Sequence, residues 1–276
     1  MRAADLSTLD GRRAVLAVAS AAAREAGALL LEHFGKLDPA AIHSKSAERD
    51  LVTAADVAAE RRLVERLRRA LPDHAIEAEE EVKDALDRRP RWFLDPLDGT
   101  VNFVHKLPAF SVSMGLYAWS DERARLEPCV AVVYAPLFGE MFSALAGGGA
   151  FLNGAPLRVS QTQLLRDSIL ATGFPYRRNE LAHNNLDNFN RFFLDVRGIR
   201  RFGSAALDLA YVAAGRFDGY WELYLSPHDV AAGALLVREA GGVVTDCDGG
   251  ENWLREGHVV AANPVLHELI RARIVH

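Results

Sequence analysis

Two segments near the N-terminus have the periodic apolar pattern of helices. Residues 14–23 form an apolar stretch that ends at two charged residues. Apolar residues at helical spacing then continue through residues 29–34, up to Gly35. This pattern predicts a helix of a folded domain rather than a signal peptide or a membrane span, and no later stretch reaches the roughly 18 apolar residues that a span requires. A second helix is predicted over residues 53–71, where leucines recur at helical spacing until Pro72.

The pattern changes to short strands between the second helix and the end of the chain. Residues 74–78 and 91–94 read as strands, with a polar loop predicted earlier at 37–50. Alternation over residues 110–144 predicts an antiparallel meander closed by a turn at 147–149. Helices and strands then alternate, which predicts an α+β fold of mixed sheets layered with helices. The predicted helices are 185–193, 205–214, 229–239 and a last one after Pro264; the strands are 168–171, 199–202, 220–223, 242–245 and 258–261.

Residues 92–103 hold the most informative cluster of polar residues. Pro96 follows an apolar strand, so the strand ladder is expected to stop and the chain to turn at Asp95. Asp95, Asp98 and the Leu97 carbonyl offer the hard oxygen ligands that suit Mg²⁺. Gly99 and Thr100 begin a short helical segment, where free backbone amides suit a phosphate. An ordinary capped turn uses the same residue types and remains the alternative at this point.

A second acidic position lies at Asp229, near the start of a helix of small residues. Helix capping is again the simpler interpretation, and the local sequence does not show that Asp229 meets Asp95. His228 beside it does not indicate a catalytic triad, because no G-x-S-x-G nucleophile motif is present. Glycine-rich dinucleotide and nucleoside triphosphate motifs are also missing from the sequence.

Composition narrows the class of protein. The 276 residues are 50% hydrophobic and 25% charged, with a net charge of −5, which is typical of a soluble globular chain and argues against nucleic-acid binding as the main role. An anionic substrate would need a local positive centre, which a metal ion supplies. The two cysteines, Cys129 and Cys247, have no metal-ligand spacing and predict no disulfide framework, so the chain is expected to be cytoplasmic.

With these clusters in view, the chain resembles the inositol monophosphatase family, particularly the bacterial inositol-1-monophosphatases, over nearly its full length. The segments that carry the resemblance are 50–56, the Glu79-Glu80 pair, 92–103, 172–176, 203–206, 227–233 and 239–242. The resemblance implies a layered α-β-α-β-α sandwich of the sugar phosphatase type and a homodimer. It also implies one compact unit over 1–276, with a metal-site half at about 1–150 and a substrate half at about 151–276.

The resemblance also assigns roles to individual residues. Two or three Mg²⁺ ions are expected on Glu79, Asp95, the Leu97 carbonyl, Asp98 and Asp229. Glu79 and Thr100 would orient the attacking water, with Asp56 supporting Thr100. The substrate is expected to contact Asp98, Gly99, Thr100, Gly203, Ser204, Ala205, Glu222 and Asp229, with Glu222 accepting ring hydroxyls. Lys45 matches a loop lysine of the family, although a solvated loop lysine explains it equally well.

Three departures from the family pattern affect these assignments. The loop between the paired glutamates and Asp95 is short, which leaves open how far it covers the site. His228 stands where the family usually has Trp, so the packing beside Asp229 is expected to differ. Ala78 replaces the usual Gly before the paired glutamates, which leaves the register open. Counting from Pro72 favours Glu79 as the ligand, with Glu80 as the alternative.

The activity implied is that of a Mg²⁺-dependent phosphomonoesterase, sensitive to lithium, that hydrolyses myo-inositol monophosphate with a metal-activated water. Fructose 1,6-bisphosphate, histidinol phosphate and phosphoadenosine phosphate are alternative substrates, because specificity lies in the pocket rather than in the metal core. A non-enzymatic alternative is a regulatory binding protein associated with the transcription machinery.

Overall fold

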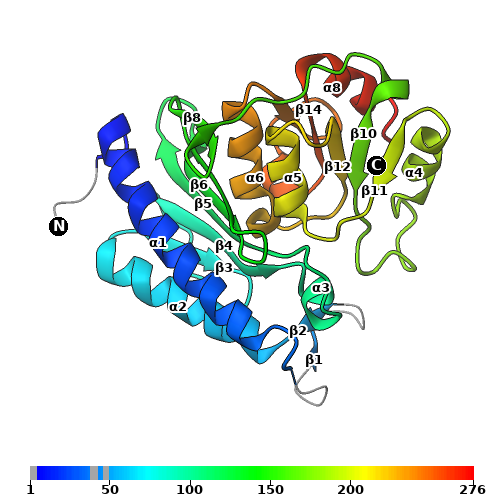
Figure 1. Ribbon diagram of the computed structural model, residues 1–276. Coiled ribbons are helices and arrows are strands. Elements are labelled where there is room, and N and C mark those ends of the chain that lie inside the picture. Colours follow the sequence, from blue (N-terminus) through cyan, green and yellow to red (C-terminus); the bar gives the residue numbers. More distant parts are fainter. Residues whose placement is uncertain (1–4, 38–42, 46–49) are drawn as a thin grey trace.

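The polypeptide folds into five alternating layers of helices and sheets (Figure 1). The computed structural model describes residues 5–37, 43–45 and 50–276. Helices α1 (Leu9–His33) and α2 (Ala54–Ala70) form the first layer, on one face of a seven-stranded sheet. Its strands follow chain order: β3 (Ala75–Ala78), β4 (Arg91–Asp98), β5 (Ser111–Ser120), β6 (Arg125–Ala135), β7 (Glu140–Leu145), β8 (Gly149–Leu152) and β9 (Ala155–Pro156).

Helices α5 (Ala205–Ala213) and α6 (Pro227–Glu239) form the middle layer between this sheet and a five-stranded one. The second sheet has the order β11-β10-β12-β14-β13, and its last two pairings are antiparallel. Its strands are β10 (Ile169–Thr172), β11 (Gly198–Arg200), β12 (Gly219–Glu222), β13 (Val243–Thr245) and β14 (Val259–Ala262). Helices α4 (Leu186–Phe193) and α8 (Pro264–Arg271) cover its outer face. The α-β-α-β-α prediction is therefore confirmed.

The first layer is held by a small-residue face. Val15, Ala19 and Ala26 of α1 have no exposed surface and pack with the apolar side of α2 against the sheet. By length and composition alone α1 would also pass for a membrane span, with a mean hydropathy of 1.6. Its packing against α2 and the sheet accounts for the apolar face, as expected for a helix of a folded domain.

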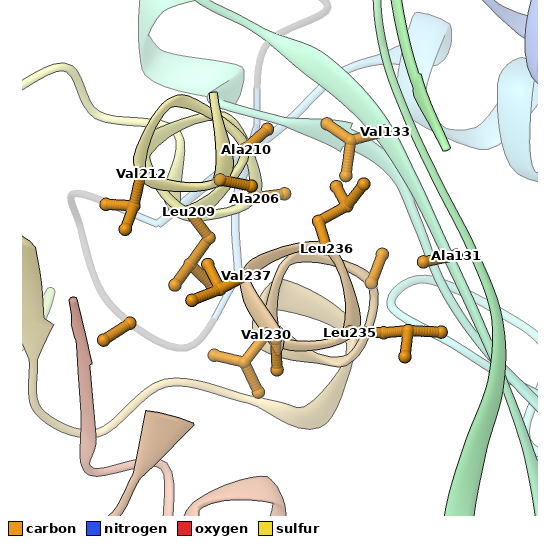
Figure 2. Packing of buried hydrophobic residues seen from close by; sticks show 14 of the residues in the cluster. Ala131, Val133, Ala206, Leu209, Ala210, Val212, Val230, Leu235, Leu236 and Val237 are labelled. Atoms are coloured by element: carbon orange, nitrogen blue, oxygen red, sulfur yellow. The ribbon is translucent and has the colours of Figure 1, made fainter. Parts of the chain in front are cut away.

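The middle layer packs tightly because α6 presents small residues to its neighbours. Leu209 of α5 lies against Gly233, where an added Cβ would come within 2.5 Å of the leucine Cβ. Figure 2 shows the two helices beside each other, with Leu236 directed toward Val133 of β6 and Val237 toward α5. Glycine at residue 233 therefore lets α5 and α6 approach closely.

Most predicted elements are confirmed, but several predictions were wrong in detail. The turn at 147–149 does not close the meander, because it connects β7 to β8 and the antiparallel sheet continues to β9. β4 does not stop before Pro96 but continues to Asp98. The pairing with β5 shifts register between Asp95 and Asp98, and Pro96 lies in this irregular stretch, where no regular ladder hydrogen bond is lost. α6 begins at Pro227, two residues before the predicted start. The predicted loop at 37–50 contains the two-residue strand β1 (His43–Ser44), paired with β2 (Leu51–Val52); its residues 38–42 and 46–49 lie outside the described residues.

Three short helical elements complete the described chain. They are α3 (Thr100–Val104), the 3-10 turn η2 (Leu165–Asp167) and α7 (Trp253–Glu256). The first of them was predicted as residues 101–105, and the other two were not predicted. Strand β11 also ends at Arg200, earlier than the predicted Phe202.

Candidate metal centre and substrate cavity

Glu79 and Asp95 meet because their strands are parallel neighbours. Ala78 at the end of β3 pairs with Leu94 of β4, and the Glu79 amide donates to the Leu94 carbonyl at 3.0 Å. The acidic segment after β3 is held by Glu60 of α2, whose carboxylate accepts hydrogen bonds of 2.7–2.9 Å from the backbone amides of residues 80, 81 and 82. This register places Glu79 in the acid cluster with Asp95, and the Lys45 ammonium bonds to both Glu79 and Glu80.

The irregular end of β4 after Asp95 bends so that its backbone contacts the Asp95 carboxylate. The Leu97 amide donates to Asp95 Oδ1 at 2.9 Å, and the Leu97 carbonyl lies 3.1 Å from the Thr100 hydroxyl. Gly99 then adopts a left-handed conformation, with φ of 97°, which glycine reaches without a steric penalty. The turn thus brings Asp98 and Thr100 to the same side as Asp95.

Asp56 supports Thr100 from the start of α2. It completes a capping box with Thr53, accepting the Thr53 amide at 2.8 Å and its hydroxyl at 2.6 Å. The second Asp56 oxygen lies 3.1 Å from the Thr100 hydroxyl. Burial raises the pKa of Asp56 to about 6 in spite of these hydrogen bonds. Since the Thr100 hydroxyl has one proton, it can donate to Asp56 or to the Leu97 carbonyl, but not to both at once.

Asp98 is bound to the beginning of α5. Its carboxylate accepts the Ser204 hydroxyl at 2.6 Å and the amides of Ala206 and Ala205 at 2.8 and 3.2 Å. Ser204 and Ala205 were predicted as substrate contacts, and the structure shows that both hold Asp98 while also lining the cavity. Ala206 was not predicted, because nothing in its own sequence surroundings marks a backbone donor.

Asp229 is the third residue of α6, and it both caps the helix and joins the cluster. Its carboxylate accepts the Ser226 amide at 2.6 Å. Ligand oxygens of Asp95, Asp98 and Asp229 all lie within 4.8 Å of one another, and so do ligand atoms of Glu79, Asp95 and His228. Asp95 belongs to both groups. Helix capping and metal ligation were alternatives for Asp229 in the sequence. The structure shows the cap, and the same carboxylate lies in a group of acids that could hold a metal ion.

The carboxylates of this cluster repel one another in a buried site. Burial, and then repulsion by Asp229, raise the pKa of Asp98 to about 7; burial and repulsion by Glu79 raise the pKa of Asp229 to about 8. The pKa of Asp95 is raised well above its ordinary value by the same two causes. Burial opposes ionisation of Glu79 too, but His228 and Lys45 leave its pKa below the ordinary value. The Lys45 ammonium lies 2.7 Å from Glu79 and 2.5 Å from Glu80.

These donors fit the implied metal. Close carboxylate oxygens in a buried site are unfavourable unless a cation neutralises them, and hard oxygen ligands match Mg²⁺. The candidate ligands are Glu79, Asp95, Leu97, Asp98 and Asp229, and all five line one cavity.

That cavity has a volume of about 610 Å³ and contains the predicted site residues apart from Asp56, which lies behind Thr100. Glu222, at the end of β12, is buried there and accepts the Tyr220 hydroxyl at 2.6 Å. Burial raises the pKa of Glu222 to about 7, against the attraction of Arg201. Tyr176 and Arg201 also line the cavity, and neither was predicted. A second cavity of about 530 Å³, beside Trp119 and Arg238, includes none of the acid cluster.

Comparison of the sequence with known proteins matches nearly the whole chain to one family. The sequence model of the Inositol monophosphatase family matches residues 12–276. The Nus factor SuhB of Pseudomonas aeruginosa is 46% identical over 261 residues, covering 90% of this chain and 91% of that protein.

Solved structures agree with the sequence match. The extragenic suppressor protein suhB of Bartonella henselae superposes with a TM-score of 0.85 at 39% identity, covering 94% of this chain and 98% of the other. Inositol monophosphatase from Anabaena (Nostoc) gives a TM-score of 0.83 at 40% identity, with 95% of both chains covered.

Proposed function

Because the chain belongs to the inositol monophosphatase family, we propose that it hydrolyses myo-inositol monophosphate to inositol and phosphate with Mg²⁺. The observation that carries this proposal is that one cavity is lined both by the five candidate metal ligands and by the buried Glu222. The acid cluster supports hydrolysis of a phosphoester, and Glu222 supports a polyol as the alcohol part of that ester.

The bound Mg²⁺ ions would neutralise the carboxylates, supply Lewis acidity to the phosphate and lower the pKa of the attacking water. Glu79 and Thr100 border the same space and would orient that water by hydrogen bonds. Asp56 holds the Thr100 hydroxyl at 3.1 Å and so fixes its direction. Gly99 and Thr100 begin α3 beside the acid cluster and are the candidate phosphate contacts.

Glu222 would select the alcohol. Its carboxylate lies at the end of β12 in the cavity, already accepts Tyr220, and retains acceptor capacity for the hydroxyls of an inositol ring. A buried acceptor disfavours a substrate without a matching hydroxyl, because the acceptor would then stay unpaired. Arg201, which lowers the pKa of Glu222, is the candidate that keeps this carboxylate ionised.

A substrate panel tests the proposal. Phosphate release is measured with the purified chain, with Mg²⁺ and with a chelator, on inositol 1-phosphate, fructose 1,6-bisphosphate, histidinol phosphate and phosphoadenosine phosphate. We expect Mg²⁺-dependent release with the highest kcat/KM for inositol 1-phosphate, and inhibition by lithium. A higher kcat/KM for another ester would overturn the substrate assignment but not the phosphatase activity. No release from any ester would overturn both.

A second role is favoured by one specific observation, the name Nus factor SuhB carried by the Pseudomonas aeruginosa relative. It supports a transcription-associated binding role for this chain, in the cytoplasm where that machinery works. The two roles separate in cells: if Asp95→Asn abolishes hydrolysis and leaves the deletion phenotype complemented, binding is the main role. Loss of complementation by this variant would instead assign the phenotype to catalysis.

A further inference from the structure

His228 is the residue that most distinguishes this site from the family pattern. It is the second residue of α6, directly before Asp229, and its side chain lines the substrate cavity with only 16% of its surface exposed. The imidazole is not hydrogen-bonded to Asp229, because the Nε2 to Oδ1 distance is 3.8 Å. The ring is therefore held in place mainly by its buried position at the start of α6.

The imidazole ring lies close enough to the acid cluster to share a metal ion with it. A ring nitrogen of His228 and one carboxylate oxygen from each of Glu79 and Asp95 lie within 4.8 Å of one another. Three ligand atoms spread evenly around one ion, at about 2.1 Å each, are about 3.6 Å apart, so binding an ion requires each pair of these atoms to approach by about 1.2 Å at most. The three donors come from three separate elements, the end of β3, β4 and α6, which all converge on one point.

The backbone around His228 is also fixed. Its carbonyl accepts the Ser113 hydroxyl of β5 at 3.3 Å, and the following residue is held by the α6 capping box. Its position therefore comes from the packing of α6 on the sheet and not from a flexible loop. Pre-organisation of this kind is a requirement for a metal ligand.

We propose that His228 is a direct nitrogen ligand of the ion held by Glu79 and Asp95. This rests on the proposed function only in that the cluster must bind a divalent cation. The nitrogen changes the expected metal preference, since Mg²⁺ favours all-oxygen sites, whereas first-row divalent ions bind mixed nitrogen and oxygen sites, Zn²⁺ more tightly than Mn²⁺. The tryptophan of the family pattern has no such lone pair, because its indole nitrogen only donates. This site is thus built to favour Mn²⁺ over Mg²⁺ more strongly than an otherwise identical site with tryptophan.

The test uses Mn²⁺ as the probe, added to the full-length chain after metal removal. Pulsed electron paramagnetic resonance detects nitrogen coupled to bound Mn²⁺, and isothermal titration calorimetry measures Mn²⁺ and Mg²⁺ affinities. The variants are His228→Gln, His228→Trp and, as a matched control, the exposed His105→Gln. Asp95→Asn establishes whether the bound ion is at the cluster.

We expect histidine coupling in the wild-type chain and in His105→Gln, and its loss in both His228 variants. His228→Gln should weaken Mn²⁺ binding about tenfold or more and Mg²⁺ binding less. Binding of Mn²⁺ that requires Asp95 but shows no nitrogen coupling in the wild type would overturn the role of His228 and leave the metal centre standing. Mn²⁺ binding that is absent, or insensitive to Asp95→Asn, would overturn the metal centre itself. The wild-type spectrum decides the question even if a variant fails to fold.

Discussion

Without divalent metal, the protein should become less stable as the pH rises. The pKa values of Asp98 and Asp229 are raised from 3.8 to about 7 and about 8, by burial and by repulsion from neighbouring carboxylates. The folded state therefore holds protons that the unfolded chain has already released. Their contribution to stability is fully present below about pH 4 and is lost as the pH rises through 7 and 8.

The size of the effect follows from these two values. Between about pH 6 and about pH 8.5, the folded-state pKa of Asp98 lies about 1 pH unit into the range and that of Asp229 about 2, so the two groups together lower the unfolding free energy by about 4 kcal/mol. Glu222 and Asp95, whose pKa values are also raised, add to this loss. For a chain of this length, 1 kcal/mol corresponds to about 2 °C, so the Tm should fall by about 8 °C or more. Bound Mg²⁺ should remove most of this fall, because it neutralises the same carboxylates in the folded state.

The assay is thermal unfolding followed by circular dichroism across this pH range, with chelator and with saturating Mg²⁺. Asp229→Asn is the matched variant, because the amide oxygen can still accept the Ser226 amide while the titrating charge is gone. It should reduce the loss of unfolding free energy of the chelated protein across this range by about 3 kcal/mol, which is the share of Asp229. A chelated wild type whose Tm is constant or rises with pH, or an Asp229→Asn variant with the wild-type slope, would refute the reasoning.

Three further predictions concern single contacts. Thr100→Ala should lower kcat on inositol 1-phosphate about 100-fold, because the hydroxyl that Asp56 holds is lost, whereas Thr100→Ser should retain most activity; equal losses would contradict a role for the hydroxyl. Glu222→Gln should raise KM for inositol 1-phosphate about tenfold with a smaller change in kcat, measured by steady-state kinetics, and an unchanged KM would exclude it as the hydroxyl acceptor. Glu239→Gln should lower the unfolding free energy, measured by urea denaturation, by about 1–2 kcal/mol, because the charged carboxylate that accepts the Gly147 and Gly149 amides at 2.8 Å is lost. An unchanged denaturation midpoint would show that these hydrogen bonds contribute little.

The sequence predicted the elements well where periodicity is strong. The leucine spacing and the Thr53–Asp56 pair mark α2 because amphipathic periodicity and a capping box are local signals. The extension of β4 to Asp98 was missed because a proline normally ends a ladder, and the register shift that accommodates it depends on pairing with the distant β5. Local rules therefore gave the wrong end for this strand, and the turn that they placed at Asp95 lies at Gly99.

The assembly of the site shows the same limit. Asp229 and Asp95 are 134 positions apart, and only the packing of α6 between the two sheets brings them together, so the pairing was expected from resemblance and not from spacing. Glu60 was overlooked as a charged helix residue. A signal was available in the sequence, since Glu60 precedes Leu63 and Leu67 by three and seven residues and so lies on the apolar face of α2, where the structure buries it. An acid on the apolar face of a helix indicates a structural partner, here the backbone amides after β3.

The central claim is that the acid cluster around Asp95 is a divalent metal centre for phosphoester hydrolysis. The most direct measurement is phosphate release from inositol 1-phosphate during a Mg²⁺ titration, for the wild type, Asp95→Asn and the charge-matched exposed variant Asp187→Asn. We predict no activity without Mg²⁺, saturable activation of the wild type and Asp187→Asn, and a loss of about 1000-fold or more in Asp95→Asn. Activity of the chelated wild type, or activity of Asp95→Asn within about tenfold of the wild type, would contradict the claim.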